Sequence, residues 1–119
     1  MCIRDSTYLV PTISAGKEAA KMADIPGFLP EVVAKKAREI GPVSEKNFRR
    51  AFKKGVSIAF GTDAGVYKHG DNAKEFGYMV DAGMPVKDAL ISATITNANL
   101  LGIDNLGQLN QVLLQILLL

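Results

Sequence analysis

The sequence is poor in the residues that hold metal ions or cross-link chains. It contains one cysteine, Cys2, and one histidine, His69, in 119 residues. A single cysteine excludes an internal disulfide, and one cysteine with one histidine cannot supply a Cys/His zinc site. Any metal site therefore needs ligands from outside this chain.

An excess of charge of one sign and long apolar runs are also missing. Lys and Arg number 14 and Asp and Glu 12, and the resulting charge of +2 is too small to indicate a nucleic-acid partner or an anionic membrane. The most apolar stretch, 112–119, is far shorter than the roughly 20 residues of a membrane-spanning helix. No signal-peptide pattern opens the chain, so the default expectation is the cytoplasm, and a signal peptide would have to lie upstream.

What is present is the composition of a globular domain, with 48% hydrophobic and 22% charged residues. Two short apolar runs, 7–11 and 56–60, are predicted to be strands. Because helices lie between them, the two strands are expected to be parallel, in a sheet covered on both faces. Two strands make a poor sheet for this many helices, so the chain resembles a piece of a larger α/β domain.

The stretch between the two strands begins with a predicted loop over 12–29, where prolines and glycines interrupt any helix. A helix is expected over 31–40, with Val33, Ala37 and Ile40 on its apolar face. Gly41 and Pro42 are expected to stop or kink this helix.

Three further helices are predicted, and each ends at a glycine. The first is capped by Ser44, and its basic residues are expected to form a solvated face. The next begins with a capping box of Asn72 and Glu75, and the last runs from Pro85 to Leu101. The expected terminating glycines are Gly55, Gly83 and Gly102.

The main chemical signal is Asp63, three residues after the strand at 56–60. Ligands bind at the carboxyl ends of parallel strands, so a carboxylate there suits metal binding or acid/base chemistry. An aspartate in a glycine-rich turn also often caps the turn itself, and the spacing leaves both roles open. His69 lies in the following loop, where substrate contact and simple exposure are both open, and Tyr67 is a residue that could line a cleft.

The run from 55 to 109, with GTDAG, HGDNAKEF and MPVKDAL, resembles the C-terminal end of metal-dependent amidohydrolases. It is similar to the branch that holds imidazolonepropionase-like and Xaa-Pro dipeptidase-like enzymes, and YLVPT at 8–12 resembles the preceding strand. The resemblance implies a (β/α)₈ barrel, of which this chain holds the last two βα units, with strands seven and eight, and a C-terminal helix.

The resemblance also implies a function. Asp63 matches the strand-eight aspartate that contacts the catalytic metal and takes a proton from the hydrolytic water. His69 matches a loop histidine expected near the substrate. The expected cofactor is a divalent metal, zinc, as one or two ions in the intact enzyme, and the expected substrate is a small or dipeptide-like molecule with a C–N bond to be cleaved.

The family's other metal ligands, including a His-x-His pair, should lie upstream of Tyr8. We therefore expect a C-terminal fragment that retains no metal and is inactive alone, since zinc normally needs three or more protein ligands and a barrel about 250 residues. The expected divisions are a non-native leader at 1–6, the end of the barrel at 7–109, and a frameshifted or truncated tail at 110–119. The alternatives are a deaminase or cyclic-amide hydrolase of the same superfamily, or a non-catalytic α/β binding module.

Overall fold

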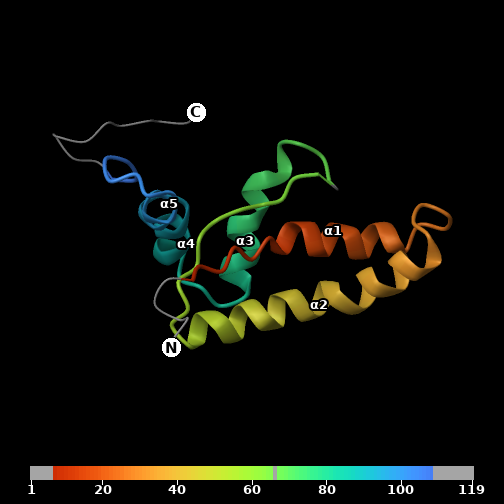
Figure 1. Ribbon diagram of the computed structural model, residues 1–119. Helices are drawn as coiled ribbons and strands as arrows, with labels where there is room; N and C mark the ends of the chain where they lie inside the picture. Colours follow the sequence, from red (N-terminus) through yellow and green to blue (C-terminus); the bar gives the residue numbers. More distant parts are fainter. Residues whose placement is uncertain (1–6, 66, 109–119) are drawn as a thin grey trace.

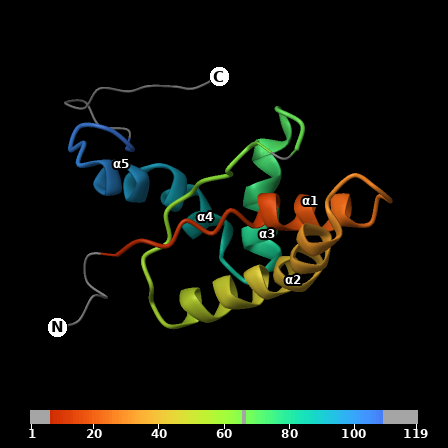
Figure 2. The same ribbon diagram turned by 45° about the vertical axis from the view of Figure 1, so that its right-hand side comes forward.

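The computed structural model describes residues 7–65 and 67–108; the predicted leader at 1–6 and the predicted tail at 110–119 lie outside these ranges. Helices α1 and α2 run side by side in opposite directions, and α3 crosses near the start of α1 (Figures 1 and 2). The elements in chain order are α1 (Ile13–Ala23), α2 (Glu31–Lys53), the 3₁₀ helix η2 (Asp71–Ala73), α3 (Lys74–Asp81), α4 (Val86–Ala93) and α5 (Ile95–Leu101).

The segments predicted as strands lie side by side, but they do not form regular strands. One parallel bridge joins Leu9 and Ile58, so the predicted parallel direction is confirmed. The Leu9 N–H donates to the Ser57 carbonyl at 2.9 Å, and the Ala59 N–H donates to the Leu9 carbonyl at 3.0 Å. The next rung would need an N–H from Pro11, which has none, so the ladder stops there.

The predicted loop over 12–29 is wrong for Ile13–Ala23, which form helix α1, and is confirmed for 24–29, which are turns and bends. Its N-cap residue, Thr12, makes no side-chain capping bond and has a left-handed backbone with φ 45° and ψ 47°. The C-terminal end of α1 is held by Arg38, which donates to the Ala23 carbonyl and pairs with Asp24 at 3.2 Å. Such contacts between a basic side chain and the last carbonyls stabilise a helix end.

The predicted stop at Gly41 and Pro42 is also wrong, because α2 is a single helix of 23 residues with Pro42 inside it, and the alternative of a kink stays a prediction. Gly41 is buried where α2 crosses α1: a Cβ atom there would lie 2.9 Å from the Cβ of Ala20 and 3.1 Å from the carbonyl oxygen of Gly16. Gly41 is therefore a point of close packing between helices and not a helix stop. Ser44, predicted as an N-cap, lies inside α2.

The predicted apolar face of this helix is also displaced. Val33 and Ile40 are about half exposed, at 49% and 48%, whereas Ala34 and Phe48 are buried. Along α2 the buried residues are Ala34, Gly41 and Phe48, so two small residues face α1 and one large side chain enters the core.

The later helices end close to where the sequence predicted. Gly55, Gly83 and Gly102 all have positive φ, at 73°, 100° and 69°, as expected of residues that terminate helices. The predicted helix over 85–101 is divided at Thr94, which has φ −118° and ψ −91° and separates α4 from α5.

The core lies where α1, the end of α2, the bridged segment and α3 meet. It is built from Ile13, Phe48, Ile58, Met79, Ala82, Met84 and Ala89. Outside this core, large apolar side chains remain exposed on α2, α4 and α5, including Val32 at 82% and Leu101 at 70%. Within the described ranges, no helix has both the length and the apolar character needed to cross a membrane.

Candidate functional site

The candidate site lies where the chain leaves the parallel bridge and turns toward α3. Asp63 follows the bridge residue Ile58 by five positions and has a left-handed backbone with φ 47°. A non-glycine residue in this region is uncommon, and such conformations often occur at functional sites. The Asp63 side chain is exposed and makes no hydrogen bond or ion pair with any other described residue. Its carboxylate is therefore available to a ligand, and no described contact supports the turn-capping role.

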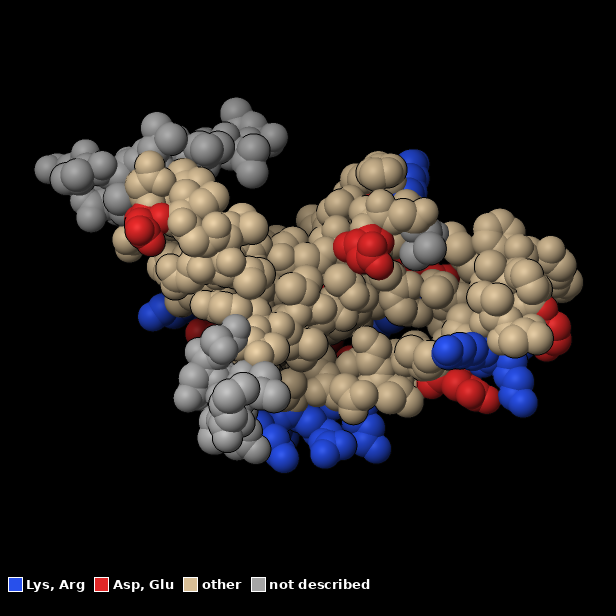
Figure 3. Space-filling view, in the orientation of Figure 1, with Lys and Arg blue, Asp and Glu red and all other residues tan. Residues whose placement is uncertain are grey.

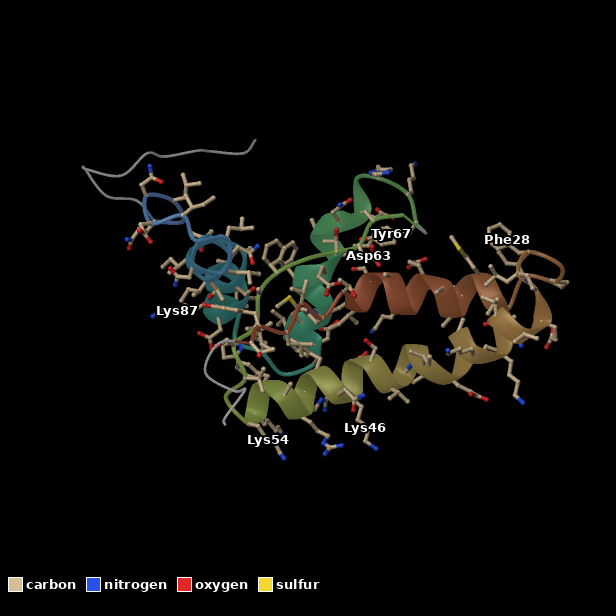
Figure 4. All side chains as sticks on the ribbon, in the orientation of Figure 1. Phe28, Lys46, Lys54, Asp63, Tyr67 and Lys87 are labelled. Atoms are coloured by element: carbon tan, nitrogen blue, oxygen red, sulfur yellow. The ribbon has the colours of Figure 1, made fainter. Side chains whose placement is uncertain are left out.

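Thr62, the neighbour of Asp63, anchors this turn to the rest of the site. Its carbonyl accepts a hydrogen bond from the Tyr67 hydroxyl at 2.9 Å, and its Oγ1 accepts one from the Asn72 amide at 3.3 Å. Figure 4 shows Asp63 and Tyr67 together on the loop that passes the start of α1. Tyr67 thus donates a hydrogen bond to the backbone of the turn that holds Asp63. The prediction that Tyr67 lines a cleft stays a prediction.

His69 is exposed, in the turn that leads into η2. No hydrogen bond joins it to Asp63 within the described residues. The Gly70 N–H donates to Asn72 Oδ1 at 3.3 Å, so Asn72 connects the His69 turn with Thr62 in the Asp63 turn. The structure therefore places both predicted site residues on one loop, 61–73, that Asn72 ties together.

Glu75 is the buried charged group of this region, with 0% of its surface exposed. Its Oε1 accepts from the Ile13 N–H at 2.8 Å, and its Oε2 accepts from the Ser14 N–H and hydroxyl at 2.7 and 2.5 Å. The sequence predicted Glu75 to cap its own helix, which is wrong: it caps α1, more than 60 residues away in the chain. A carboxylate at a helix N-terminus satisfies free N–H groups and is favoured by the helix dipole.

Asn97 is a second residue that the sequence did not indicate. From α5, its Oδ1 accepts from the Phe60 N–H and its Nδ2 donates to the Phe60 carbonyl, both at 3.0 Å. The Asn97 amide thus imitates a neighbouring strand at the end of the segment that leads to Asp63. Asparagine disfavours a helix interior, but in the sequence ITNANLL this weak signal does not point to Phe60.

The charged groups around the site are mainly local pairs. Lys74, in the first turn of α3, donates to Asp71 at 2.9 Å, and this bond raises the pKa of the Lys74 ammonium above its ordinary value. Across 7–65 and 67–108, no three His, Cys, Asp or Glu side chains come close enough together to hold a metal ion. The residues present therefore do not fit a metal by themselves, and Asp63 could contribute only one ligand.

Two other surface features lie apart from these residues. The basic residues predicted as a solvated face are exposed at the end of α2, along the lower edge of the molecule in Figure 3: Arg49, Arg50, Lys53 and Lys54. An open groove of about 280 Å³ between α1 and α2 has an apolar lining from small and branched side chains such as Ala19 and Val32. Neither Asp63 nor His69 lines this groove.

Comparison with known proteins identifies the class of protein to which this fold and site belong. The sequence matches the amidohydrolase family over residues 1–111. The chain belongs to this family, which is generally metal-dependent. No curated protein matches the sequence.

A solved structure gives a more particular likeness. The crystal structure of a Xaa-Pro dipeptidase with bound methionine in the active site is 57% identical, with a TM-score of 0.82. The match covers 85% of this chain and 25% of the dipeptidase chain, so this chain spans about a quarter of that protein.

These comparisons confirm the resemblance to an amidohydrolase fragment and support an α/β fold class. The chain is therefore a fragment from a hydrolase family, and it is similar to a Xaa-Pro dipeptidase. The assignment of 7–11 and 56–60 to strands seven and eight of a barrel stays a prediction, as do the roles of Asp63 and His69.

Proposed function

We propose that this chain supplies the strand-end aspartate of a hydrolase site that cleaves a C–N bond in an amide or dipeptide-like substrate. The observation that carries the proposal is the state of Asp63: its carboxylate is exposed, follows the paired segment, and has no partner among the described residues. The likeness to a Xaa-Pro dipeptidase at 57% identity favours a dipeptide with a C–N bond to proline as the substrate.

In this proposal Asp63 acts as the acid/base residue of the intact enzyme and contacts its divalent metal, for which zinc is our expectation. Asp63 takes a proton from the water whose oxygen bonds to the carbonyl carbon. As the C–N bond breaks, Asp63 returns the proton to the leaving nitrogen, so the group ends in its starting state. An exposed carboxylate that has no partner among residues 7–65 and 67–108 suits both transfers.

His69 is proposed as a substrate contact. A neutral imidazole carries one donor and one acceptor nitrogen, so it can bind either a carbonyl or an amide of a dipeptide. Its position on the same loop as Asp63, joined through Asn72 and Thr62, supports a shared role.

We further propose that the 119-residue chain alone neither retains a metal nor turns over substrate. Structural and catalytic zinc sites use three or more protein ligands, and Asp63 is one. The remaining ligands would come from residues equivalent to the other three quarters of the dipeptidase. Residues 1–6 and 110–119 are proposed to be a non-native leader and a frameshifted or truncated tail, and the nucleotide sequence around the reading frame tests both.

The test compares the chain alone with a chimera in which residues 7–108 replace the corresponding quarter of the Xaa-Pro dipeptidase. Metal content is measured by inductively coupled plasma analysis, and hydrolysis is followed with Xaa-Pro dipeptides. We expect stoichiometric metal and turnover in the chimera and neither in the isolated chain. Turnover or stoichiometric zinc in the isolated chain would refute the claim of inactivity. A folded, metal-loaded chimera without turnover would refute the proposed substrate class.

A further inference from the structure

Glu75 stands out among the described residues because it is a fully buried carboxylate to which the proposed chemistry gives no part. None of the ion pairs within the described ranges includes it, and its partners are three donors in the first turn of α1. A buried charge is costly unless hydrogen bonds compensate it. The start of α1 and the start of α3 must therefore stay close enough for these bonds to form. Glu75 thereby joins the start of α3 to the start of α1.

On one side of this link lies the end of the first paired segment. Thr12 has a left-handed backbone and directly precedes Ile13 and Ser14, whose N–H groups bind Glu75. Thr12 itself gives α1 no side-chain cap, so the Glu75 carboxylate takes that role. The conformation at the end of this segment therefore depends on a side chain from α3.

On the other side lies the turn that carries Asp63. Phe76, next to Glu75, stacks on Phe60 with ring centroids 4.2 Å apart. Asn72, three residues before Glu75, donates to Thr62, the neighbour of Asp63. The beginning of α3 therefore contacts the first turn of α1 through Glu75 and the end of the second paired segment through Phe76, and η2 just before it contacts Thr62 through Asn72.

We propose that Glu75 is a positioning residue for the Asp63 site, acting through α3, Asn72 and Thr62. The ends of the two parallel segments, Thr12 and Asp63, keep their relative placement because one buried carboxylate fastens α1 to α3. The importance of this role for catalysis rests on the function proposed above. The link itself can be measured without metal or substrate, so its failure is distinguishable from failure of the proposed function.

The test uses the full 119-residue chain, labelled with ¹⁵N and ¹³C, with Glu75→Gln as the variant. The glutamine keeps the shape of the side chain, but its NH₂ group cannot accept the Ser14 donors. Glu39→Gln, on the exposed face of α2, removes the same charge as a matched control. Amide hydrogen exchange is read at Ile13 and Ser14, and the ¹³Cγ resonance is read at Asp63.

We expect Glu75→Gln to accelerate exchange at Ser14 by roughly tenfold or more, since the NH₂ group cannot accept the Ser14 bonds, and at Ile13 by less, since its acceptor becomes a neutral amide oxygen. We also expect it to shift the Asp63 ¹³Cγ resonance and the amide resonances of 62–72, while Glu39→Gln leaves all of these unchanged. Faster exchange in α1 with an unshifted Asp63 resonance would overturn the proposal, because Glu75 would then only cap α1.

A second variant keeps the test decisive if Glu75→Gln does not fold. Ser14→Ala removes only the hydroxyl bond to Glu75 Oε2 and leaves both backbone bonds in place. It should move the same resonances in 62–72 in the same direction by smaller amounts. Unchanged resonances in folded Ser14→Ala would overturn the proposal.

Discussion

The close approach of α1 and α2 at Gly41 allows a stability prediction with two opposing terms. In Gly41→Ala, the new Cβ would lie 2.9 Å from the Cβ of Ala20 and 3.1 Å from the Gly16 carbonyl oxygen. Overpacking of this kind costs about 1–3 kcal/mol. Replacing a helix-interior glycine by alanine returns about 0.5–1 kcal/mol. We therefore expect Gly41→Ala to lower the free energy of unfolding by up to about 2.5 kcal/mol.

Gly77 provides the matched control, because it lies inside helix α3 and, among the described residues outside that helix's backbone, a Cβ atom added there would meet nothing within 4 Å. Gly77→Ala carries only the helix-propensity term, so it should raise the free energy of unfolding by about 0.5–1 kcal/mol. Urea denaturation followed by circular dichroism measures both variants, and the predicted difference between them is about 1–3 kcal/mol. Equal stabilisation by both substitutions would refute the claim that Gly41 is held by close packing.

Two further predictions concern polar contacts. Asn97→Ala removes two hydrogen bonds to the Phe60 backbone and should lower the free energy of unfolding by about 1–2 kcal/mol. The Phe60 N–H keeps the Ser92 carbonyl as its acceptor, whereas the Phe60 carbonyl loses its donor. Urea denaturation that shows no loss of stability would contradict this prediction. The hydrogen bond to Glu18 raises the pKa of the Lys21 ammonium. The bond is therefore fully present at a pH below the ordinary lysine pKa, and it is lost as the pH rises through the raised pKa of Lys21. Glu18→Gln should lower the Lys21 pKa toward its ordinary value in an NMR titration, and an unchanged pKa would exclude this cause.

Local sequence signals predicted the features that depend on local chemistry. Gly55, Gly83 and Gly102 terminate helices because each position needs positive φ, a requirement that can be read from sequence. The parallel direction of the two apolar runs followed from the helices between them. The choice of Asp63 as the candidate site also rests on a local pattern, its place after an apolar run, and it stays a prediction.

Contacts between distant residues account for the predictions that were wrong. Helix α1 is not predicted from its sequence because its N-terminal cap is Glu75, which is more than 60 positions away. The residues around Ile13 do not indicate that this cap exists. The Gly41–Pro42 pair predicts a stop or kink from local sequence, whereas the packing of Gly41 against Ala20 depends on a contact across 21 positions. The runs expected as strands form one bridge because the ladder cannot continue past Pro11.

The residues that support Asp63 were hidden for the same reason. Asn97 binds the Phe60 backbone across 37 positions, and an asparagine in a helix gives no indication of its partner. Sequence could locate the carboxylate that carries the proposed chemistry, but not the side chains that hold its segment in place.

The measurement that most directly tests the central claim is the kcat of the chimera described above with Asp63→Asn. The asparagine keeps the size of the side chain but cannot carry a proton between water and the leaving nitrogen, and a positioned general acid/base contributes about 10²–10⁴-fold. Asp104→Asn, an exposed change elsewhere in the chain, is the control. We predict a loss of at least about a hundredfold in kcat for Asp63→Asn alone, in folded protein. A kcat equal to that of the Asp104→Asn control would contradict the assignment of Asp63 as the acid/base residue.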